Sequence, residues 1–202
     1  MITWNILRAA GFGAYFVLFV SVALGLTGTT SLSKARPSKQ SAIGVHQFLA
    51  TVGLLLLAIH LTGVALDTWI DFRTTDLFFP MMQDAYKPVA IAVGIVAMYS
   101  MVLVTVASWL RKRMSTRFWR VTHMLAIPTF MMAMLHGIFA GTDTVRPFVF
   151  WTYLITGVIV FFLTLFRAFT VRERRPKSAA TRAVTASAAT EAVSAATEAA
   201  AR

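Results

Sequence analysis

Five apolar runs, each long enough to cross a lipid bilayer, constrain the fold of this chain more than any other feature. A transmembrane helix needs about 20 consecutive apolar residues. Only 13% of the 202 residues are charged, whereas a soluble domain has about 25%. We therefore expect an all-α, polytopic membrane helix bundle with about five transmembrane helices. The runs cover residues 9–27, 44–66, 88–110, 121–140 and 147–166.

The charges between the runs predict the orientation of the bundle. Residues 28–43 hold three basic and no acidic residues, and residues 111–120 hold five basic and no acidic residues. Residues 67–87 hold four acidic and two basic residues. Because cytoplasmic loops are rich in Lys and Arg, we expect the first two loops and the C-terminus inside and the N-terminus outside, in a multi-pass protein of the cell inner (plasma) membrane. The same distribution explains the net charge of +11 without nucleic-acid binding.

The end of the chain differs in composition from the rest. Residues 171–202 are basic at first and then rich in Ala, Thr and Ser, with too few large apolar side chains to form a core. We expect residues 1–170 to form the transmembrane domain. Residues 171–202 would form a cytoplasmic tail, either disordered or a fraying helix.

All four histidines fall inside the apolar runs, two on the second run and two on the fourth. His46 and His60 are 14 residues apart, and His123 and His136 are 13 apart. These separations correspond to rises of about 21 Å and about 20 Å along a helix. The two helices are expected to run in the same direction, so His46 and His123 would share a level near the cytoplasm. His60 and His136 would share a level near the outer face.

This double pairing predicts two haems. Histidine inside a membrane segment faces the protein interior, where it binds or relays something, and a haem iron accepts a neutral imidazole on each side. We expect a di-haem cytochrome b with the four histidines as metal ligands. Levels about 20 Å apart exclude one zinc or copper ion shared by all four. Hydrogen bonding between helices is the simpler alternative for any single histidine.

Helix rotation tests the pairing. Fourteen residues turn about 1400°, within about 40° of four full turns, so His46 and His60 share a face. Thirteen residues fall about 140° short of four turns, which would splay His123 from His136. Pro128 lies between these two residues. We expect Pro128 to kink the helix and restore the alignment.

Other residues are candidates to contact the haems. Gly53 lies midway between His46 and His60, where a porphyrin would need short side chains, although small residues also serve ordinary helix packing. Arg73 and Arg146 stand in outer loops against the positive-inside rule, so they are candidates to bind haem propionates.

The two histidine pairs, with these spacings and on helices of equal direction, resemble the ferric reductase-like transmembrane domain. That family includes NADPH oxidases, ferric-chelate reductases and the haem-binding membrane subunit of the bacterial methionine sulfoxide reductase system. The resemblance covers residues 9–170. It implies that His46 and His123 ligate an inner haem and that His60 and His136 ligate an outer one. It also implies electron flow from a cytoplasmic flavin through both haems to an extracytoplasmic acceptor.

About 35 residues follow the last run, too few for a flavin-binding or nicotinamide-binding domain. We therefore expect an oxidoreductase component, with no catalytic residue of its own to assign. Its electron donor would be a separate flavoprotein, a flavin (FMN or FAD) on the protein or a partner, or the quinone pool.

Two other functions stay open. The chain would serve as the haem-bearing membrane anchor of a quinone-linked dehydrogenase or reductase, with the same ligands and a different direction of flow. It would otherwise be a haem-free membrane scaffold or transporter, although the five runs contain no acidic residue that would serve a carboxylate proton relay.

Overall fold

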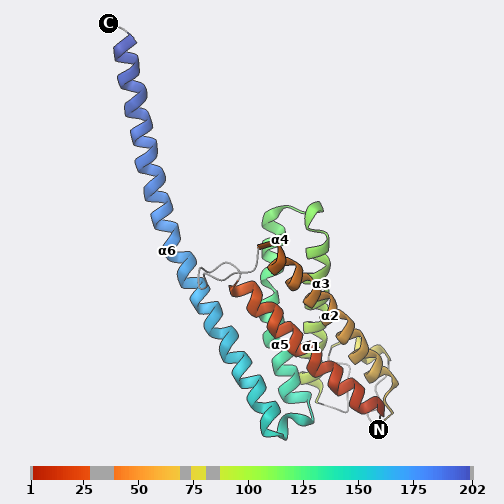
Figure 1. Ribbon diagram of the computed structural model, residues 1–202. Coiled ribbons are helices and arrows are strands. Elements are labelled where there is room, and N and C mark those ends of the chain that lie inside the picture. Colours follow the sequence, from red (N-terminus) through yellow and green to blue (C-terminus); the bar gives the residue numbers. More distant parts are fainter. Residues whose placement is uncertain (1, 28–38, 69–73, 81–86, 201–202) are drawn as a thin grey trace. The chain divides into compact units, whose positions relative to one another are not determined.

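The computed structural model describes residues 2–27, 39–68, 74–80 and 87–200. Within these ranges the chain forms α-helices and short 3₁₀ turns and no β-strand. Figure 1 shows the helices in sequence colours. The elements in chain order are α1 (Ile2–Thr27), α2 (Lys39–Leu66), η1 (Thr74–Leu77), α3 (Pro88–Trp109), η2 (Arg111–Arg113), α4 (Thr116–Met124), α5 (Ala126–Ala140), η3 (Asp143–Val145) and α6 (Pro147–Ala200).

In the part of the chain that the structure describes, five helical segments are long and apolar enough to cross a membrane, which confirms the predicted all-α membrane bundle. The first of them begins at Ile2 rather than at residue 9, because residues 2–8 continue the same helix. The five segments are Ile2–Thr27, Gln40–Leu66, Pro88–Trp109, Thr116–Ala140 and Pro147–Thr170.

The fourth membrane segment is interrupted between α4 and α5. α4 begins after Ser115, whose side chain accepts a hydrogen bond from the Phe118 amide, as an N-cap serine does. It ends at Met124, and the Leu125 amide bonds back to the Thr122 carbonyl at 3.1 Å. Pro128 has no N–H to donate to the Met124 carbonyl, and its ring crowds that carbonyl. The structure therefore has a helix break where we predicted a kink.

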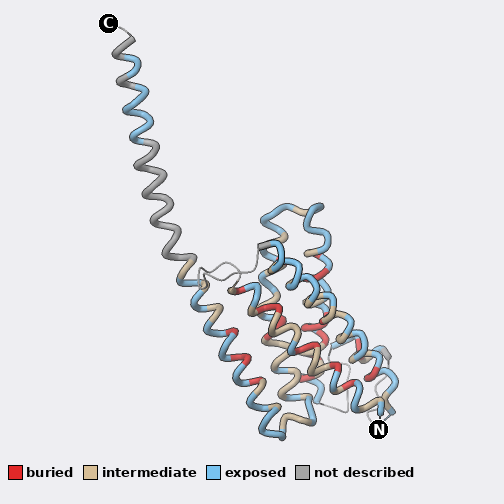
Figure 2. Tube along the Cα trace, viewed as in Figure 1, coloured by how far each residue is buried: buried red, intermediate tan, exposed pale blue. Residues whose placement is uncertain are grey.

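The core of the unit formed by residues 1–161 lies between helix pairs. α1 packs along α2, α3 packs along α5, and α1 also contacts α5. Figure 2 shows the buried positions concentrated on the inward faces of these helices. Phe130 of α5 is fully buried and its ring stacks on Tyr15 of α1, with centroids 5.4 Å apart. The Tyr15 hydroxyl makes a hydrogen bond with Thr156 in the first turns of α6.

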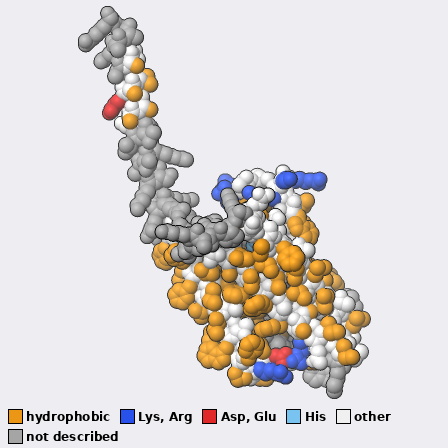
Figure 3. Space-filling model, viewed as in Figure 1, with side chains coloured by type: hydrophobic (Ala, Val, Ile, Leu, Met, Phe, Trp, Pro, Cys, Tyr) orange, Lys and Arg blue, Asp and Glu red, His pale blue; other side chains and the backbone are white. Residues whose placement is uncertain are grey.

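The outside of this unit is apolar, as a lipid-facing surface must be. Large hydrophobic side chains such as Phe48 and Leu55 of α2 are exposed. Figure 3 shows a wide band of hydrophobic side chains, with Lys and Arg side chains gathered at its two ends. This distribution fits a bundle whose middle lies in hydrocarbon.

Residues 162–202 form a second compact unit. Here α6 continues to Ala200, so the Ala-rich tail is helical in the structure, as expected for the strongest helix-forming residue.

Candidate functional site

The four histidines form two pairs, one near each end of the bundle. Within each pair, the two rings face each other. The rings of His46 (α2) and His123 (α4) have centroids 5.9 Å apart and planes at 76°. The rings of His60 (α2) and His136 (α5) have centroids 6.5 Å apart and planes at 80°. The structure thus brings together the residues that the spacing paired. α2 and the α4–α5 segment must therefore run in the same direction.

The ring separations match two imidazoles on opposite sides of one metal ion. A metal–imidazole bond of about 2.0–2.1 Å and a nitrogen about 1.15 Å from its ring centroid place the two centroids about 6.4 Å apart. Both observed separations lie close to this value. Among the described residues there is no group of three or more His, Cys, Asp or Glu suited to a metal ion. A haem iron needs only two protein ligands, one on each face.

We keep the names outer pair for His60 and His136 and inner pair for His46 and His123, after the levels expected from the sequence. Backbone carbonyls on neighbouring helices orient the outer pair. His60 Nδ1 donates a hydrogen bond to the Leu7 carbonyl of α1 at 2.8 Å. His136 Nδ1 donates to the Ala90 carbonyl of α3 at 2.9 Å. Because each Nδ1 carries the proton, each Nε2 keeps its lone pair. A hydrogen bond of this kind fixes the tautomer and orientation of a metal-ligating histidine.

The inner pair is oriented by serines on the same two helices. His46 Nδ1 lies 3.0 Å from Ser21 Oγ and 3.1 Å from the Ser21 carbonyl of α1. His123 Nδ1 lies 3.3 Å from Ser108 Oγ of α3. The Ser108 hydroxyl donates to the Val104 carbonyl at 2.8 Å, so its oxygen accepts from the histidine. All four Nδ1 atoms are therefore engaged by α1 or α3.

Two glycines that our sequence reasoning missed make room for the outer imidazoles. A Cβ atom on Gly11 of α1 would lie 2.7 Å from His60 Nδ1. A Cβ atom on Gly94 of α3 would overlap the ring of His136. Gly53, the predicted contact residue, instead faces the Met101 side chain, whose terminal methyl would lie 2.9 Å from an added Cβ atom. The small residues that touch ligand rings thus lie on the helices that support the histidines.

A cavity of about 530 Å³ adjoins the outer pair, and His60, His136, Gly11 and Gly94 contribute to its lining. Phe12, Leu57 and Ile95 are among its apolar walls. A largely apolar cavity between two facing imidazoles suits a planar macrocycle with an iron at its centre.

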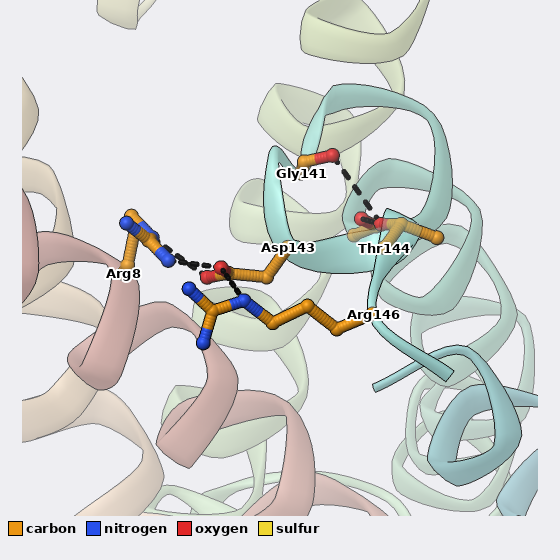
Figure 4. Close-up of polar contacts among 6 residues, drawn as sticks. Arg8, Gly141, Asp143, Thr144 and Arg146 are labelled. Carbon is orange, nitrogen blue, oxygen red and sulfur yellow. Dashed lines mark hydrogen bonds and ion pairs between the residues drawn. The ribbon is translucent and has the colours of Figure 1, made fainter. Parts of the chain in front are cut away.

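Charged side chains are among the residues that line this cavity, and Figure 4 shows the contacts between them. Arg8 Nε of α1 lies 2.6 Å from Asp143 Oδ2, and a second nitrogen of Arg8 contacts the other carboxylate oxygen. Arg146 Nε lies 3.4 Å from Asp143 Oδ1. Arg146, a predicted cation, and Arg8, which the sequence did not single out, both line the cavity. Arg73, the other predicted cation, lies outside the described residues.

Two buried polar atoms have no hydrogen-bond partner among the described residues, Trp119 Nε1 and Asp67 Oδ2. Trp119 stacks on His123 of the inner pair, and Asp67 lines the cavity of the outer pair. Burying an unpaired polar group costs about 1–3 kcal/mol. The Trp119 indole N–H is a donor only, so its position beside His123 fits a site that a group with a hydrogen-bond acceptor completes.

Comparison with known proteins supports the same family that the histidine spacing suggested. The family model of the ferric reductase like transmembrane component matches residues 10–134. This range contains His46, His60 and His123 and ends two residues before His136. No curated protein and no solved structure matches the chain. The family match covers more than half of the 202 residues, and the chain therefore belongs to the ferric reductase-like transmembrane component family, as a multi-pass membrane electron-transfer component.

Proposed function

We propose that this chain is a cytochrome b that conducts electrons across a membrane through two haems. His46 and His123 would ligate the inner haem, and His60 and His136 the outer one. The observation that carries the proposal is the pair of facing imidazoles at each level, spaced for one metal ion. The hydrogen bonds that hold the Nδ1 atoms of these histidines against α1 and α3 support it.

The protein's own residues would bind, orient and enclose the cofactors. When bound, haem b supplies the one-electron chemistry. α1 and α3 hold the imidazoles through their Nδ1 atoms, which also sets how strongly each imidazole donates electron density. Apolar side chains around the outer cavity exclude water. Arg146 and Arg8, and Arg73 beyond the described residues, would meet anionic propionates.

We further propose the orientation and partners. The loops 28–43 and 111–120 and the C-terminus would be cytoplasmic, in the cell inner membrane. Residues 1–170 would form the electron-transfer domain and residues 171–202 a tail. Electrons would come from a flavin on the protein or on a separate flavoprotein, or from quinol, and leave to an extracytoplasmic acceptor.

Haem quantitation and spectroscopy test the proposal. The purified full chain should contain two haems and show a reduced-minus-oxidised b-type spectrum. The double variant H60L/H136L should keep one haem, and H46L/H123L should keep the other, each with its own midpoint potential. Gln47→Leu, which changes an exposed residue beside His46, should keep both and serves as the control. A chain without haem after expression with ample haem, or with both haems in H60L/H136L, would contradict the proposal.

The choice of donor is tested on the same preparation. Reduced FMN and a short-chain quinol are each mixed with the oxidised protein, and the rate of haem reduction is measured. Faster reduction by flavin supports flow from a cytoplasmic flavin. Reduction by quinol alone would place the chain in a quinone-linked complex.

A further inference from the structure

A series of three side chains leads from the surface to the inner histidine pair. Trp119 and His123 are one turn apart on α4, on the same helix face. Their rings stack with centroids 5.1 Å apart and planes at 20°. The guanidinium carbon of Arg111, in η2, lies 4.3 Å from the Trp119 ring centroid, within the range of a cation–π interaction.

The series crosses from solvent into the bundle. Arg111 is exposed, whereas Trp119 and His123 are partly buried. Arg111 belongs to the loop with five basic and no acidic residues between 111 and 120. A negatively charged donor, such as a flavin that carries a phosphate, is attracted to this surface.

The indole nitrogen gives a second, independent observation. Trp119 Nε1 is buried and has no partner within the described residues. An indole N–H is a donor only, so its burial indicates an acceptor that arrives with a bound group. The carboxylates of the inner haem have the required chemistry.

We propose that Trp119 is the electron-input residue of the inner site. An electron from a reduced flavin at the Arg111 surface would cross the Trp119 ring to His123. The haem that His123 would hold would accept this electron, and the flavin would lose it. No bond forms or breaks, and the indole is unchanged at the end. This inference rests on the proposed function and adds the residue through which electrons would enter from the donor.

The physical reason is the distance that the electron must cross. Electron tunnelling slows steeply as the gap between donor and acceptor widens. A conjugated ring in contact with the ligand imidazole shortens the gap from the surface. Arg111 holds that ring in place and also attracts the donor. An ordinary interface anchor would stabilise the helix without affecting the rate.

The test uses the full chain loaded with haem in detergent or nanodiscs. Reduced FMN is mixed with the oxidised protein in a stopped-flow instrument, and reduction of the inner haem is followed. Trp119→Leu should slow this step severalfold while both haems remain. The reduction rate of Trp119→Phe should lie between those of Trp119→Leu and the unmodified protein, because phenylalanine retains a smaller aromatic ring. Trp109→Leu, an exposed tryptophan at the end of α3, should match the unmodified protein.

A second variant pair covers the case in which Trp119→Leu loses its inner haem. Arg111→Gln and Lys112→Gln each remove one positive charge from the same loop, but only Arg111 is placed over the Trp119 ring. Arg111→Gln should slow reduction by FMN more than Lys112→Gln does. Equal rates for these two variants, or a normal rate in a fully loaded Trp119→Leu, would overturn the inference. Neither result affects the proposed function, which is tested by the haem content of the unmodified chain and of the histidine double variants.

Discussion

At the scale of single residues, His123 of the inner pair differs from the outer histidines in what accepts its Nδ1 proton. Outer histidines donate to the backbone carbonyls of Leu7 and Ala90 at 2.8 and 2.9 Å. The inner His123 donates to a serine hydroxyl at 3.3 Å. A stronger acceptor makes the imidazole more electron-rich, which stabilises ferric iron. This difference would set the two proposed haems at different potentials.

Ser108→Ala should raise the midpoint potential of the inner haem. The variant removes the acceptor of His123 Nδ1–H, so the imidazole donates less electron density to iron. A hydrogen bond of about 0.5–1.5 kcal/mol corresponds to a shift of about 20–65 mV for one electron. Spectroelectrochemical titration measures both haems, and the outer potential should stay constant. Thr105→Val, which removes a hydroxyl bonded to the Met101 carbonyl of the same helix, is the control. A shift of equal size in the control would contradict the assignment.

Gly94→Ala and Gly11→Ala should each remove the outer haem and spare the inner one. The added methyl group would occupy the space of the His136 or His60 ring, and the backbone of α3 or α1 gives it little room to move. Haem content per chain should fall from two to about one. Gly13→Ala is the matched control on α1, since its Cβ would lie 3.4 Å from the flexible end of Leu56. Two haems in Gly94→Ala would show that this packing does not matter.

At the scale of elements, the break between α4 and α5 decides which way His123 points relative to His136. A continuous helix would place these residues about 140° short of a shared face. The interruption at Leu125 separates the rotation of α4 from that of α5. Each short helix then presents one histidine to α2, and each histidine is backed by α3.

Pro128→Ala should favour a continuous helix, because it restores an N–H and relieves the crowding at Met124. We expect His123 to turn away from His46 and the inner haem to be lost. Haem content and the reduced spectrum measure this. Pro147→Ala, at the first position of α6, should have little effect since proline at the start of a helix forfeits no hydrogen bond. Retention of both haems in Pro128→Ala would mean that packing, rather than proline, imposes the break.

At the scale of the whole molecule, polar contacts connect parts of the chain that are far apart in sequence. Arg8 and Asp143 join the start of α1 to the loop before α6 across 135 residues. Their side chains are 27% and 28% exposed, so solvent screens part of this attraction. The pair fixes the outer end of the cavity next to the proposed outer haem.

Asp143→Asn should raise the outer midpoint potential and lower thermal stability only slightly. Removing an anion near the iron favours its reduced form, and a partly exposed ion pair contributes about 0–1 kcal/mol. Potentiometry and a thermal unfolding scan measure the two effects. Asp76→Asn, in η1 and outside the set of residues that line the cavity, should change neither. A falling outer potential would contradict the placement of Asp143.

The sequence by itself determined the class of the protein, the five spans and the levels of the four histidines. These follow from local properties, since apolar run length and residue spacing translate directly into helix length and rise. It also indicated a distortion near Pro128, predicted as a kink and found as a break, because proline disturbs the helical turn that contains it. Tertiary structure alone decided what orients the imidazoles. The bond from His60 to Leu7 spans 53 residues and that from His136 to Ala90 spans 46. Their acceptors are backbone carbonyls, which every residue carries, so no residue type signals them. The roles of Gly11 and Gly94 could not be predicted for a similar reason. Each glycine makes room for a histidine ring of another helix, and only the packing of distant helices brings the two together.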